Sequence, residues 1–355
     1  MQRILVDQQD ITGIRSDEVP EPALQDGQAR LKLESFALTA NNVTYAASGF
    51  AIGYWKFFPT GVEGQGLVPV WGVAQVVESR AGDLAEGTRL YGFYPMAETL
   101  VIQPRVSSRG TVTDIAPHRE GLPAVYNSYI PLQETSPEDD HMRALLQPLL
   151  ATSYLLADWL GDNDQFGAEQ VIVGSASSKT GLGLCKYLAE REDRDFRIVG
   201  LTSAGNRAFV ENLGACDEVY SYDEITRIAQ RGAVYVDMAG NAQVKAALHA
   251  HLADHPKHSA AVGISHWQDF NPKAPLEGVK PEFFFAPAQI AKRRADWGPG
   301  EIDRRIEAAV QRIAQEASGW LEVKVHEGLD TVPQVYGALA AGRADPREGH
   351  VIRLI

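Results

Sequence analysis

The sequence predicts a two-domain α/β protein, in which a β-rich domain is combined with a doubly wound parallel sheet. The first observation is that residues 1 to about 145 hold short alternating runs of apolar and polar side chains, separated by Gly, Pro and Asp. The second is that, from Val171 onward, short apolar runs alternate with segments of helical periodicity. The third is size, because 355 residues with 45% hydrophobic side chains suffice for two cores.

The overall charge argues against nucleic acids as partners. The formal net charge is −13 and the pI is about 5.2, so the chain has no general basic surface for a nucleic acid, while a small phosphorylated ligand stays compatible. No stretch approaches the roughly 18 to 20 apolar residues that cross a bilayer. We therefore expect a cytoplasmic protein that acts on a small molecule and binds neither nucleic acid nor membrane.

Cysteine and histidine usage does not indicate a metal centre. Cys185 and Cys216 are the only cysteines, whereas a structural zinc site needs about four ligands. We expect both to be small buried apolar side chains in a reducing compartment. Four histidines lie between positions 249 and 258, but residues two apart on a helix do not face each other. The sequence therefore predicts no bound metal.

The first half contains two clear strand patterns and one segment without a pattern. Ala29–Leu38 and Gly72–Ser79 alternate as half-buried strands do. The segment Gln103–Gln147 includes a polar and aromatic tract at 118–129 that has no periodicity. We expect a long ordered loop or an insertion there rather than a regular element.

The second half alternates strands and helices. Leu145, Leu149, Leu155 and Trp159 recur at helical spacing and predict a helix that leads into the strand at Val171. Further strands are predicted at 197–203, 233–238 and 259–265, and an amphipathic helix at 302–317. Strands that alternate with helices in this way predict a parallel sheet.

The segment 171–189 is the element around which the second half is organised. Three apolar residues are followed by a run of small polar residues and then by a helical pattern. Such a turn can bind a phosphate, because small side chains leave backbone N–H groups uncovered and the helix N-terminus carries partial positive charge. The predicted cofactor-binding residues of this turn are Ser175, Ser177, Ser178, Lys179, Thr180 and Gly181.

The same turn admits a second interpretation. Gly174 with Lys179 and Thr180 is one glycine short of a P-loop, and the strand ending at Asp237 is similar to the strand that holds magnesium in nucleoside triphosphatases. A P-loop needs glycine before the lysine so that its backbone can wrap the phosphate, and Ser178 stands at that position. The β-rich first half also favours a dinucleotide-binding domain over a P-loop.

Several motifs together resemble the medium-chain dehydrogenase/reductase superfamily, in its zinc-independent quinone oxidoreductase and enoyl reductase branch. The segment 171–181 stands where that family has an apolar strand and an Ala-Ala-Gly-Gly-Val-Gly turn, with Ser178 and Lys179 in place of two glycines. The cysteine and Gly-His-Glu ligands of the zinc-dependent members have no counterpart. The other matching segments are Thr44–Gly49, Glu86–Gly92, Leu213–Ala215, Val219–Tyr222 and Gly349–Leu354.

The resemblance implies a domain plan and a cofactor. It implies a GroES-like catalytic domain at residues 1–145 and 300–355, interrupted by a Rossmann NADP-binding domain at residues 146–299. It further implies that NADPH binds between the two domains, that no metal participates, and that the protein is often a homodimer.

The choice between NADPH and NADH depends on charge at the end of the second predicted strand. An NAD site usually places a carboxylate there for the ribose 2′-hydroxyl, whereas this strand ends in Leu201–Ser203 without one. By resemblance to NADPH-dependent quinone oxidoreductases, Ser203, Arg207 and Tyr222 surround the 2′-phosphate, and Gly263 completes the predicted cofactor contacts. The alternative is that Arg207 is solvated and Tyr222 is a core aromatic residue.

Hydride transfer also needs a group that stabilises charge on the substrate oxygen. Tyr45 lies in the segment that faces substrate in the family, so it is the predicted catalytic donor, although a tyrosine is more often a packed residue. His118 with Arg119 is a candidate for binding a substrate carboxylate, and the alternative is a solvated pair. The predicted substrate-binding residues are Tyr54, Tyr126, Asn127 and Phe284.

These observations predict an NADPH-dependent oxidoreductase that reduces an activated alkene or a carbonyl, such as an enone, a quinone or an enoyl ester. The alternative is a non-catalytic NADPH-binding sensor or interaction protein, because a fold does not determine function. The degraded glycine pattern favours the alternative, and the predicted 2′-phosphate site favours a protein that uses its cofactor.

Overall fold

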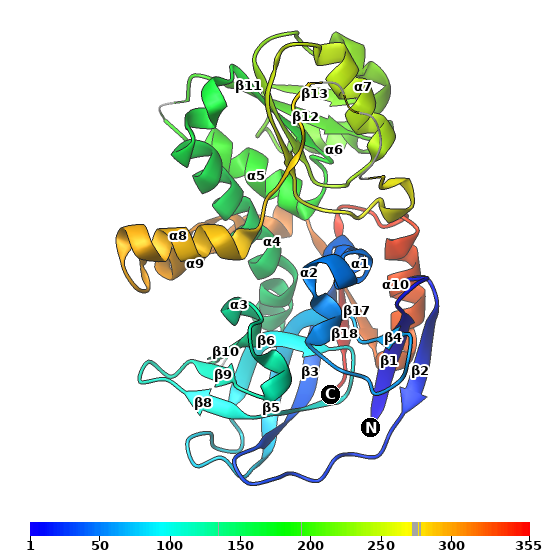
Figure 1. Cartoon of the computed structure of the whole chain (residues 1–355), viewed down its shortest axis with the longest axis vertical. Helices are drawn as coiled ribbons and strands as arrows, with labels where there is room; N and C mark the ends of the chain where they lie inside the picture. The colour runs from blue at the N-terminus through cyan, green and yellow to red at the C-terminus, as the bar shows by residue number, and fades with distance from the viewer. Residues whose placement is uncertain (134, 193, 272–275, 277) are drawn as a thin grey trace. The chain divides into compact units, whose positions relative to one another are not determined.

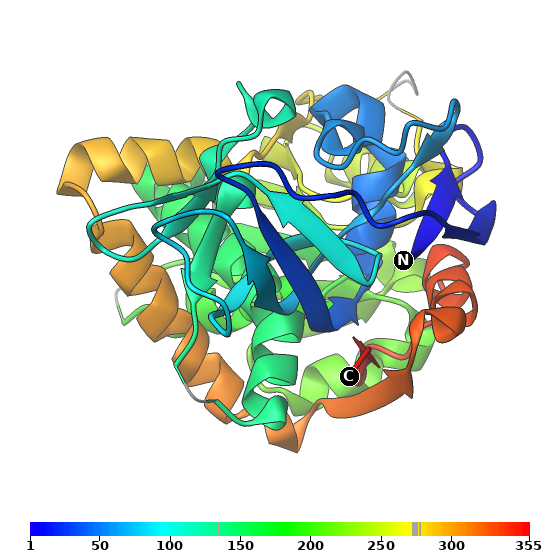
Figure 2. The ribbon, with the colours of Figure 1, turned by 90° about the horizontal axis from the view of Figure 1, so that it is seen from below.

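The chain forms two compact units in this computed structural model. The structure describes residues 1–133, 135–192, 194–271, 276 and 278–355. Unit 1 comprises Met1–Leu145 and Glu322–Ile355, and unit 2 comprises Leu146–Leu321. The two ends of the chain, marked N and C in Figure 1 and Figure 2, therefore both belong to unit 1.

Unit 1 is built on two mainly antiparallel sheets. The smaller has the order β2-β1-β4, and the larger has the order β17-β18-β3-β5-β6-β10-β9-β8, with β7 paired to β3. Among the described strands of the larger sheet, β17 and β18 are the only parallel pair. The strands are β1 (Gln2–Asp7), β2 (Ile14–Glu18), β3 (Ala29–Leu38), β4 (Gln65–Gly66), β5 (Pro69–Ser79), β6 (Arg89–Pro95), β7 (Thr99–Ile102), β8 (Pro104–Val106), β9 (Val112–Asp114), β10 (Ser128–Pro131), β17 (Glu322–Glu327) and β18 (Glu348–Arg353).

The two strands predicted in this unit are confirmed as β3 and β5, which pair with each other. The prediction of a long loop at 103–147 is wrong, because β8, β9 and β10 extend the larger sheet there and α4 begins at Pro137. Strands of three or four residues are too short to show a period in the sequence. Their pairing partners, which lie elsewhere in the chain, define them instead.

Short helices complete unit 1. The N-terminus of α1 is closed by a capping box, in which Thr39 Oγ1 accepts from the backbone of Asn41 and Asn42 Oδ1 accepts from the backbone N–H of Thr39. This cap fixes the start of the helix that carries Tyr45. The helices are α1 (Ala40–Ala47), α2 (Gly49–Ile52), α3 (Ala124–Asn127) and α10 (Val332–Ala340), and α4 (Pro137–Asp162) continues across the boundary at Leu145.

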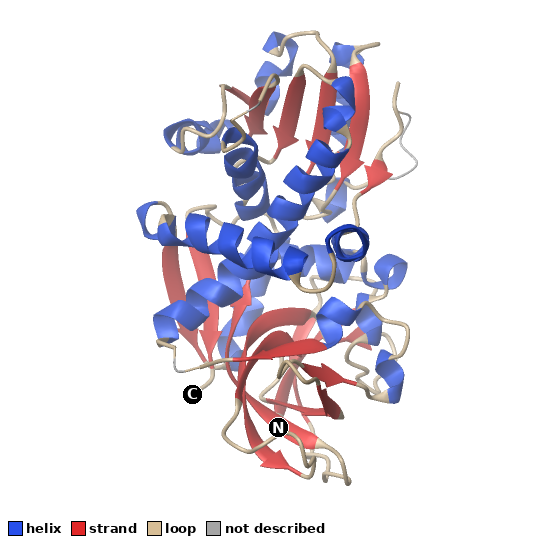
Figure 3. Ribbon diagram, turned by 90° about the vertical axis from the view of Figure 1, so that its left-hand side faces the viewer, coloured by secondary structure: helices blue, strands red, loops and turns tan. Residues whose placement is uncertain are grey.

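Unit 2 contains a parallel sheet with the order β13-β12-β11-β14-β15-β16. This is the 3-2-1-4-5-6 order of a doubly wound sheet, and Figure 3 shows helices on both of its faces. The predicted fold class is therefore confirmed. The strands are β11 (Gln170–Gly174), β12 (Arg197–Thr202), β13 (Glu218–Ser221), β14 (Ala233–Asp237), β15 (Pro256–Ala261) and β16 (Glu282–Phe283), and the helices are α5 (Lys179–Ala189), α6 (Arg207–Asn212), α7 (Ala242–Leu252), α8 (Ala286–Trp297) and α9 (Glu301–Gln315).

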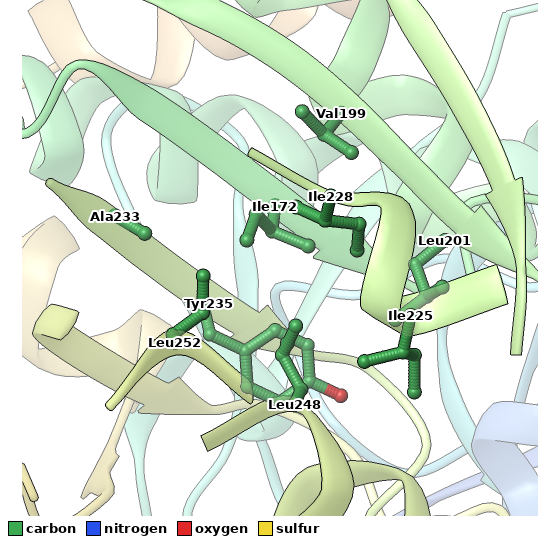
Figure 4. Packing of buried hydrophobic residues seen from close by; sticks show 9 residues of the cluster. All are labelled: Ile172, Val199, Leu201, Ile225, Ile228, Ala233, Tyr235, Leu248 and Leu252. Atoms are coloured by element: carbon green, nitrogen blue, oxygen red, sulfur yellow. The ribbon is translucent and has the colours of Figure 1, made fainter. Parts of the chain in front are cut away.

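One face of this sheet is closed by an apolar cluster that Figure 4 shows from close by. The cluster combines strand side chains such as Ile172, Leu201 and Tyr235 with Leu248 and Leu252 of α7. A strand with helices on both faces must be apolar on both, which explains the continuous apolar runs seen in the sequence. The cluster includes side chains of β11, β12 and β14, and the carboxyl ends of these paired strands carry the candidate site.

The division of the chain differs from the expected one at residues 300–321, which lie in unit 2. Ion pairs link α9 and the residues that follow it to other regions of that unit. Arg312 Nη2 lies 2.7 Å from Glu190 Oε2, and Glu316 Oε2 lies 2.6 Å from Lys186 Nζ. Among the described residues, no helix is both long and apolar enough to span a membrane.

Candidate functional site

The turn after β11 forms a tight loop that leads directly into α5. Ser175 has a φ of 53°, a left-handed conformation that usually favours glycine. Ser178 is the N-cap of α5, and its Oγ accepts a hydrogen bond at 3.1 Å from the backbone N–H of Gly181. This cap satisfies one of the helix's first N–H groups and leaves the helix N-terminus as a source of partial positive charge.

Glycine is required at position 181 by close approach of the backbone. A Cβ at Gly181 would lie 2.6 Å from the carbonyl oxygen of Ser175 and 3.0 Å from Ser178 Oγ. Gly183 has a similar role further along α5, where a Cβ would lie 2.6 Å from Ser153 Oγ of α4. The glycines that remain in this motif therefore serve the fold of the turn and the packing of α5.

The predicted residues of the turn differ in how deeply they are buried. Ser177 is buried, and its Oγ accepts from Thr202 Oγ1 at 3.0 Å and from Asn206 Nδ2 at 3.3 Å, which ties the turn to β12. Lys179 and Thr180 open α5 and are partly exposed. The carbonyl of Thr180 accepts from Ser153 Oγ at 2.8 Å.

The predicted residues beyond the turn lie near the carboxyl ends of neighbouring strands. Ser203 follows β12 and makes no side-chain cap bond, and Gly263 follows β15 with its N–H directed at the carbonyl of Asp237. Tyr222 follows β13 and hydrogen-bonds with Ser175. Burial raises the pKa of the Tyr222 phenol, so the group is a neutral donor at ordinary pH. Ser175 and Tyr222, which the sequence separates, are thus in contact.

The end of β12 carries no carboxylate, but two carboxylates from other segments lie beside Arg207. Its Nη1 is 2.6 Å from Glu224 Oε2, and its Nε is 2.8 Å from Glu211 Oε1. Hydrogen bonds from the backbone and side chain of Ser221 lower the pKa of Glu224 to about 2, with a further contribution from Arg207 and Arg227. Glu224 is therefore ionised at neutral pH, and a phosphate at Arg207 would have to compete with it.

Asp237, which the P-loop interpretation assigned to magnesium, is engaged within the protein. It is buried, and its Oδ1 accepts from the backbone N–H groups of Ala239 and Gly240 at 3.2 and 2.8 Å. Its Oδ2 lies 3.5 Å from Lys245 Nζ. This arrangement supports a structural carboxylate at the end of β14 rather than a metal ligand.

In unit 1 the structure brings three predicted tyrosines into one aromatic cluster. The ring centroids of Tyr45 and Tyr54 are 4.4 Å apart, and those of Tyr54 and Tyr126 are 5.7 Å apart. The hydroxyls of Tyr54 and Tyr126 are hydrogen-bonded at 3.1 Å, and Tyr45 Oη accepts from Trp71 Nε1 at 3.2 Å. Trp71 was not among the predicted residues, because one tryptophan in a strand pattern does not indicate what it contacts.

Burial controls the acid–base state of this cluster. Tyr45 is 5% exposed and Tyr54 is 6% exposed. Desolvation raises the pKa values of Tyr45, Tyr54 and Tyr126 well above the ordinary phenol value. All three are therefore neutral O–H groups over the physiological pH range, which suits a hydrogen-bond donor and excludes a phenolate base.

Arg119 and Asn127 form a separate buried arrangement beside the cluster. Asn127 Oδ1 accepts from Arg119 Nη1, and Asn127 Nδ2 donates to the carbonyl of Arg119, both at 3.2 Å. Arg119 Nε lies 3.3 Å from Asp114 Oδ2, and its guanidinium stacks over Phe58 at 4.6 Å. Asn127 thus holds Arg119 in place. Arg119 is buried whereas His118 is exposed, so His118 and Arg119 do not form the predicted carboxylate-binding pair.

The remaining candidate side chains lie in unit 2. Phe284 is 7% exposed and packs on Trp159 with 5.4 Å between ring centroids, which is a packing contact. His258 stacks on Phe166 at 4.0 Å, while His249 and His251 contact Ser259 and the carbonyl of Ile228. Within the portion of the chain that the structure describes, no three His, Cys, Asp or Glu side chains are grouped to hold a metal ion.

A family model described as "Protein of unknown function (DUF2855)" matches residues 36–345. The chain belongs to this family. The match covers all of unit 2 and much of unit 1, so the DUF2855 region includes both the turn after β11 and the aromatic cluster. No curated protein matches the sequence.

Solved structures share the fold over the whole chain. CurA from Vibrio vulnificus in complex with NADPH is 12% identical, with a TM-score of 0.63 and coverage of 100% of this chain and 99% of CurA. The yhdH oxidoreductase from Salmonella enterica in complex with NADP is 15% identical, with a TM-score of 0.56 and full coverage of both chains. A putative NADPH:quinone reductase from Bacillus thuringiensis is 13% identical, with a TM-score of 0.57 and coverage of 100% and 99%. This DUF2855 chain therefore has the fold of these proteins.

Proposed function

We propose that the protein is an NADPH-dependent oxidoreductase of the medium-chain dehydrogenase/reductase type that reduces an activated alkene or a carbonyl without a metal. The observation that carries this proposal is the turn between β11 and α5. It lies at the carboxyl end of the central strand of a doubly wound sheet, where Ser178 caps the helix and Gly181 admits the backbone of Ser175. Dinucleotides bind at this place in such sheets, and two proteins of the same fold are complexes with NADPH or NADP.

The residues of unit 2 fit a dinucleotide phosphate. The N-terminal N–H groups of α5 and the small residues of the turn would hold the pyrophosphate, because no bulky apolar side chain stands in the segment 174–181. Ser175 and Tyr222 would add hydroxyl groups to the same edge of the sheet. When bound, NADPH would supply the hydride.

The neutral phenols of unit 1 fit the other requirement of the reaction. Charge that develops on a substrate oxygen needs a donor that stays protonated, and Tyr45 meets this condition because burial raises its pKa. Its oxygen accepts from Trp71 through a lone pair, which does not use the Tyr45 proton, and Asn41 is a second hydrogen-bond partner of the same hydroxyl. In this proposal Tyr45 donates to the substrate oxygen, and Tyr54 with Tyr126 provides apolar area and a second pair of hydroxyls.

A cofactor titration followed by turnover measurements tests the proposal. The protein should quench or shift nicotinamide fluorescence on binding NADPH, and it should oxidise NADPH in the presence of at least one member of a panel of enones, quinones and aldehydes. Binding without oxidation of NADPH by any panel member would favour the non-catalytic sensor. The non-catalytic sensor is the second candidate function because Tyr45 and Tyr54 are almost fully buried, which leaves their hydroxyls little access to a substrate. Absence of binding would contradict both.

Arg207 gives a test of cofactor preference. Charge-assisted hydrogen bonds contribute on the order of 1.5 to 3 kcal/mol, which corresponds to roughly 10- to 150-fold in affinity. Because Glu224 and Glu211 already accept from Arg207, we expect the lower end, so NADPH should bind about 10-fold more tightly than NADH. Arg207→Ala should remove this preference by weakening NADPH alone.

Two further variants make the test of Arg207 specific. Arg227 also pairs with Glu224 but is more exposed, so Arg227→Ala removes the same charge without touching the predicted site. Glu224→Gln removes one of the two carboxylates that pair with Arg207 and should increase the preference for NADPH. Equal affinities for NADPH and NADH in the unmodified protein, or equal effects of the two arginine variants, would place the 2′-phosphate elsewhere. Titrations of both cofactors into each protein supply the measurement.

Metal independence gives a further prediction. We expect the purified protein to contain no stoichiometric zinc and to keep its full rate of NADPH oxidation after prolonged dialysis against a chelator. Bound structural or catalytic zinc would be lost, together with stability or activity, under the same treatment. Elemental analysis that finds about one zinc per chain would contradict this expectation.

A further inference from the structure

The helix α3, labelled in Figure 1, is too short to fix its own position. It has four residues, Ala124–Asn127, and its N-terminus has no side-chain cap. Isolated helices shorter than about 12 to 15 residues are marginal in water, so contacts with other segments determine where α3 lies. The position of α3 matters because the helix carries Tyr126, whose hydroxyl is bonded to the hydroxyl of Tyr54 at 3.1 Å.

The side chain of Arg119 binds the end of α3. Its Nη1 donates to the carbonyl oxygen of Tyr126 at 3.4 Å and to Asn127 Oδ1 at 3.2 Å. In return, Asn127 Nδ2 donates to the carbonyl oxygen of Arg119 at 3.2 Å. The last two residues of α3 are therefore both bonded to Arg119.

Arg119 is itself fixed by an ion pair and by aromatic rings. Its Nε lies 3.3 Å from Oδ2 of Asp114, the last residue of β9, and the other carboxylate oxygen of Asp114 accepts from two backbone N–H groups at 3.0 Å. The guanidinium lies over the rings of Phe58 and Phe57, at 4.6 and 5.4 Å from their centroids. The ring of Phe57 in turn packs on Tyr126 with 5.4 Å between centroids. Arg119 thus links β9 to α3.

Stability alone does not explain an arginine at this position. The side chains of Arg119 and Asp114 are each 1% exposed, so both charges have been removed from water. The attraction between two buried charges often only offsets that loss, and apolar residues of similar volume often give equal or greater stability. What an apolar residue would not supply is the N–H group that bonds to Tyr126 and Asn127.

We propose that Arg119 is a positioning residue of the candidate active site in unit 1 and acts through Tyr126, an inference that rests on the proposed function. By binding the carbonyl oxygen of Tyr126, Arg119 fixes the direction of that phenol and its hydrogen bond to Tyr54. The ring of Tyr54 lies 4.4 Å from the ring of Tyr45, the proposed donor. The alternative is that Arg119 only stabilises the fold of the segment 114–127.

Hydrogen exchange of the whole protein tests the contact with α3 without reference to activity. Arg119→Lys keeps a positive charge beside Asp114 but lacks the planar fork of N–H groups, so it cannot serve the carboxylate and the carbonyl of Tyr126 together. We expect amide exchange within residues 120–128 to be about 10-fold faster than in the unmodified protein, and exchange in β3 and β5 to be unchanged. Unchanged exchange at 120–128 would overturn the proposal.

Arg30→Lys is the matched control. Arg30 is another buried arginine of unit 1, in which Nη2 donates to the carbonyl oxygen of Pro22 at 2.8 Å and Nε lies 3.3 Å from Glu78 Oε2. These partners belong to β5 and to the segment before β3 rather than to α3. Arg30→Lys should lower the unfolding temperature without changing kcat/KM or the exchange of residues 120–128. Equal effects of the two lysine variants on kcat/KM would overturn the proposal.

A double-mutant cycle tests whether Arg119 acts through Tyr126. A misplacement of about 1 Å near a reaction centre can cost roughly 100-fold in rate, so Arg119→Lys and Tyr126→Phe should each lower kcat/KM by about 10- to 100-fold. The two changes together should lower kcat/KM no further than Tyr126→Phe alone. An arginine with only a structural role would give losses that multiply. That result, or an unchanged kcat/KM for Tyr126→Phe, would overturn the proposal.

A charge-neutral variant keeps the test decisive if Arg119→Lys does not fold. Asp114→Asn combined with Arg119→Met leaves no unpaired buried charge, and the amide oxygen of Asn can still accept the two backbone N–H groups. This variant should unfold within a few degrees of the unmodified protein and show the same faster exchange and lower kcat/KM. Normal values of both quantities would contradict a positioning role, and failure to fold would show that the ion pair has a structural role instead.

The same measurements separate this inference from the proposed function. Faster exchange at 120–128 in a protein that oxidises NADPH with no member of the panel would confirm that Arg119 fixes α3 and contradict the proposed function. Equal kcat/KM values for the unmodified protein and Arg119→Lys, in a protein that does oxidise NADPH, would contradict the positioning role alone.

Discussion

Gly181→Val should destabilise the protein by about 3 kcal/mol and weaken NADPH binding by about 100-fold or more. Even the first carbon of a side chain at this position would lie 2.6 Å from a backbone oxygen, that of Ser175. A backbone atom has little room to retreat, because the hydroxyl of Ser178 and the N–H of Gly181 are bonded across the same turn. The turn must therefore open, and the helix N-terminus would move away from any phosphate placed there.

The matched control for this variant is Gly319→Ala. Gly319 also belongs to unit 2, but a Cβ there has no heavy atom within 4 Å and its backbone is not left-handed. Thermal unfolding should separate the two variants by several degrees, and titration with NADPH should show normal affinity for Gly319→Ala only. If Gly181→Val unfolds at the same temperature as the unmodified protein, the carbonyl oxygen of Ser175 does not approach position 181 as closely as the structure shows. If it is destabilised but binds NADPH normally, the phosphate lies elsewhere.

Tyr45→Phe should lower kcat and kcat/KM together by roughly 10- to 1000-fold. The proposal gives the Tyr45 hydroxyl a contact that forms fully only when charge develops on the substrate oxygen, so the rate of the chemical step should fall while NADPH affinity stays the same. Because burial holds the phenol neutral, the rate should show no decline from phenol ionisation between pH 7 and about 10.

Tyr91→Phe is the matched control for the phenol of Tyr45. Tyr91 is buried in the same region and stacks on Trp71 at 5.5 Å, but its Oη has no hydrogen-bond partner among the described residues. Loss of that hydroxyl should leave kcat unchanged. Steady-state kinetics of both variants, with the substrate found in the panel, provide the comparison. An unchanged kcat for Tyr45→Phe would transfer the role to Tyr126, and a Tyr126→Phe variant checks that directly.

The fold class was predictable because it depends on local side-chain periods. Apolar alternation in β3 and β5 and continuous apolar runs in β11, β12 and β14 are set by which faces of a strand are buried. The strands β8, β9 and β10 escaped prediction, because three or four residues carry too little pattern. Their hydrogen-bond partners in the sheet stabilise them, and those partners are remote in sequence.

The candidate site likewise has some features that the sequence predicted and others that only the folded structure shows. The sequence predicted the small residues between β11 and α5, because a phosphate-binding turn has a recognisable composition over a few consecutive residues. It also predicted Ser203, Arg207 and Tyr222, because each follows the end of a predicted strand. The carboxylates of Glu224 and Glu211 against Arg207 were not predicted, although each is near in number, because side-chain direction depends on how η5 (Tyr222–Arg227) and α6 fold. The burial that keeps Tyr45 neutral was likewise beyond the sequence.

The sequence by itself determined the strand and helix pattern, the parallel sheet and the position of the turn, since these follow from periodicity and from residue size. Only the tertiary structure decided which side chains meet. It brought Tyr45, Tyr54 and Tyr126 into one aromatic cluster, and it paired the side chain of Asn127 with Arg119. The physical reason is that periodicity is a property of neighbours along the chain, whereas contact, desolvation and pKa depend on groups that folding brings together.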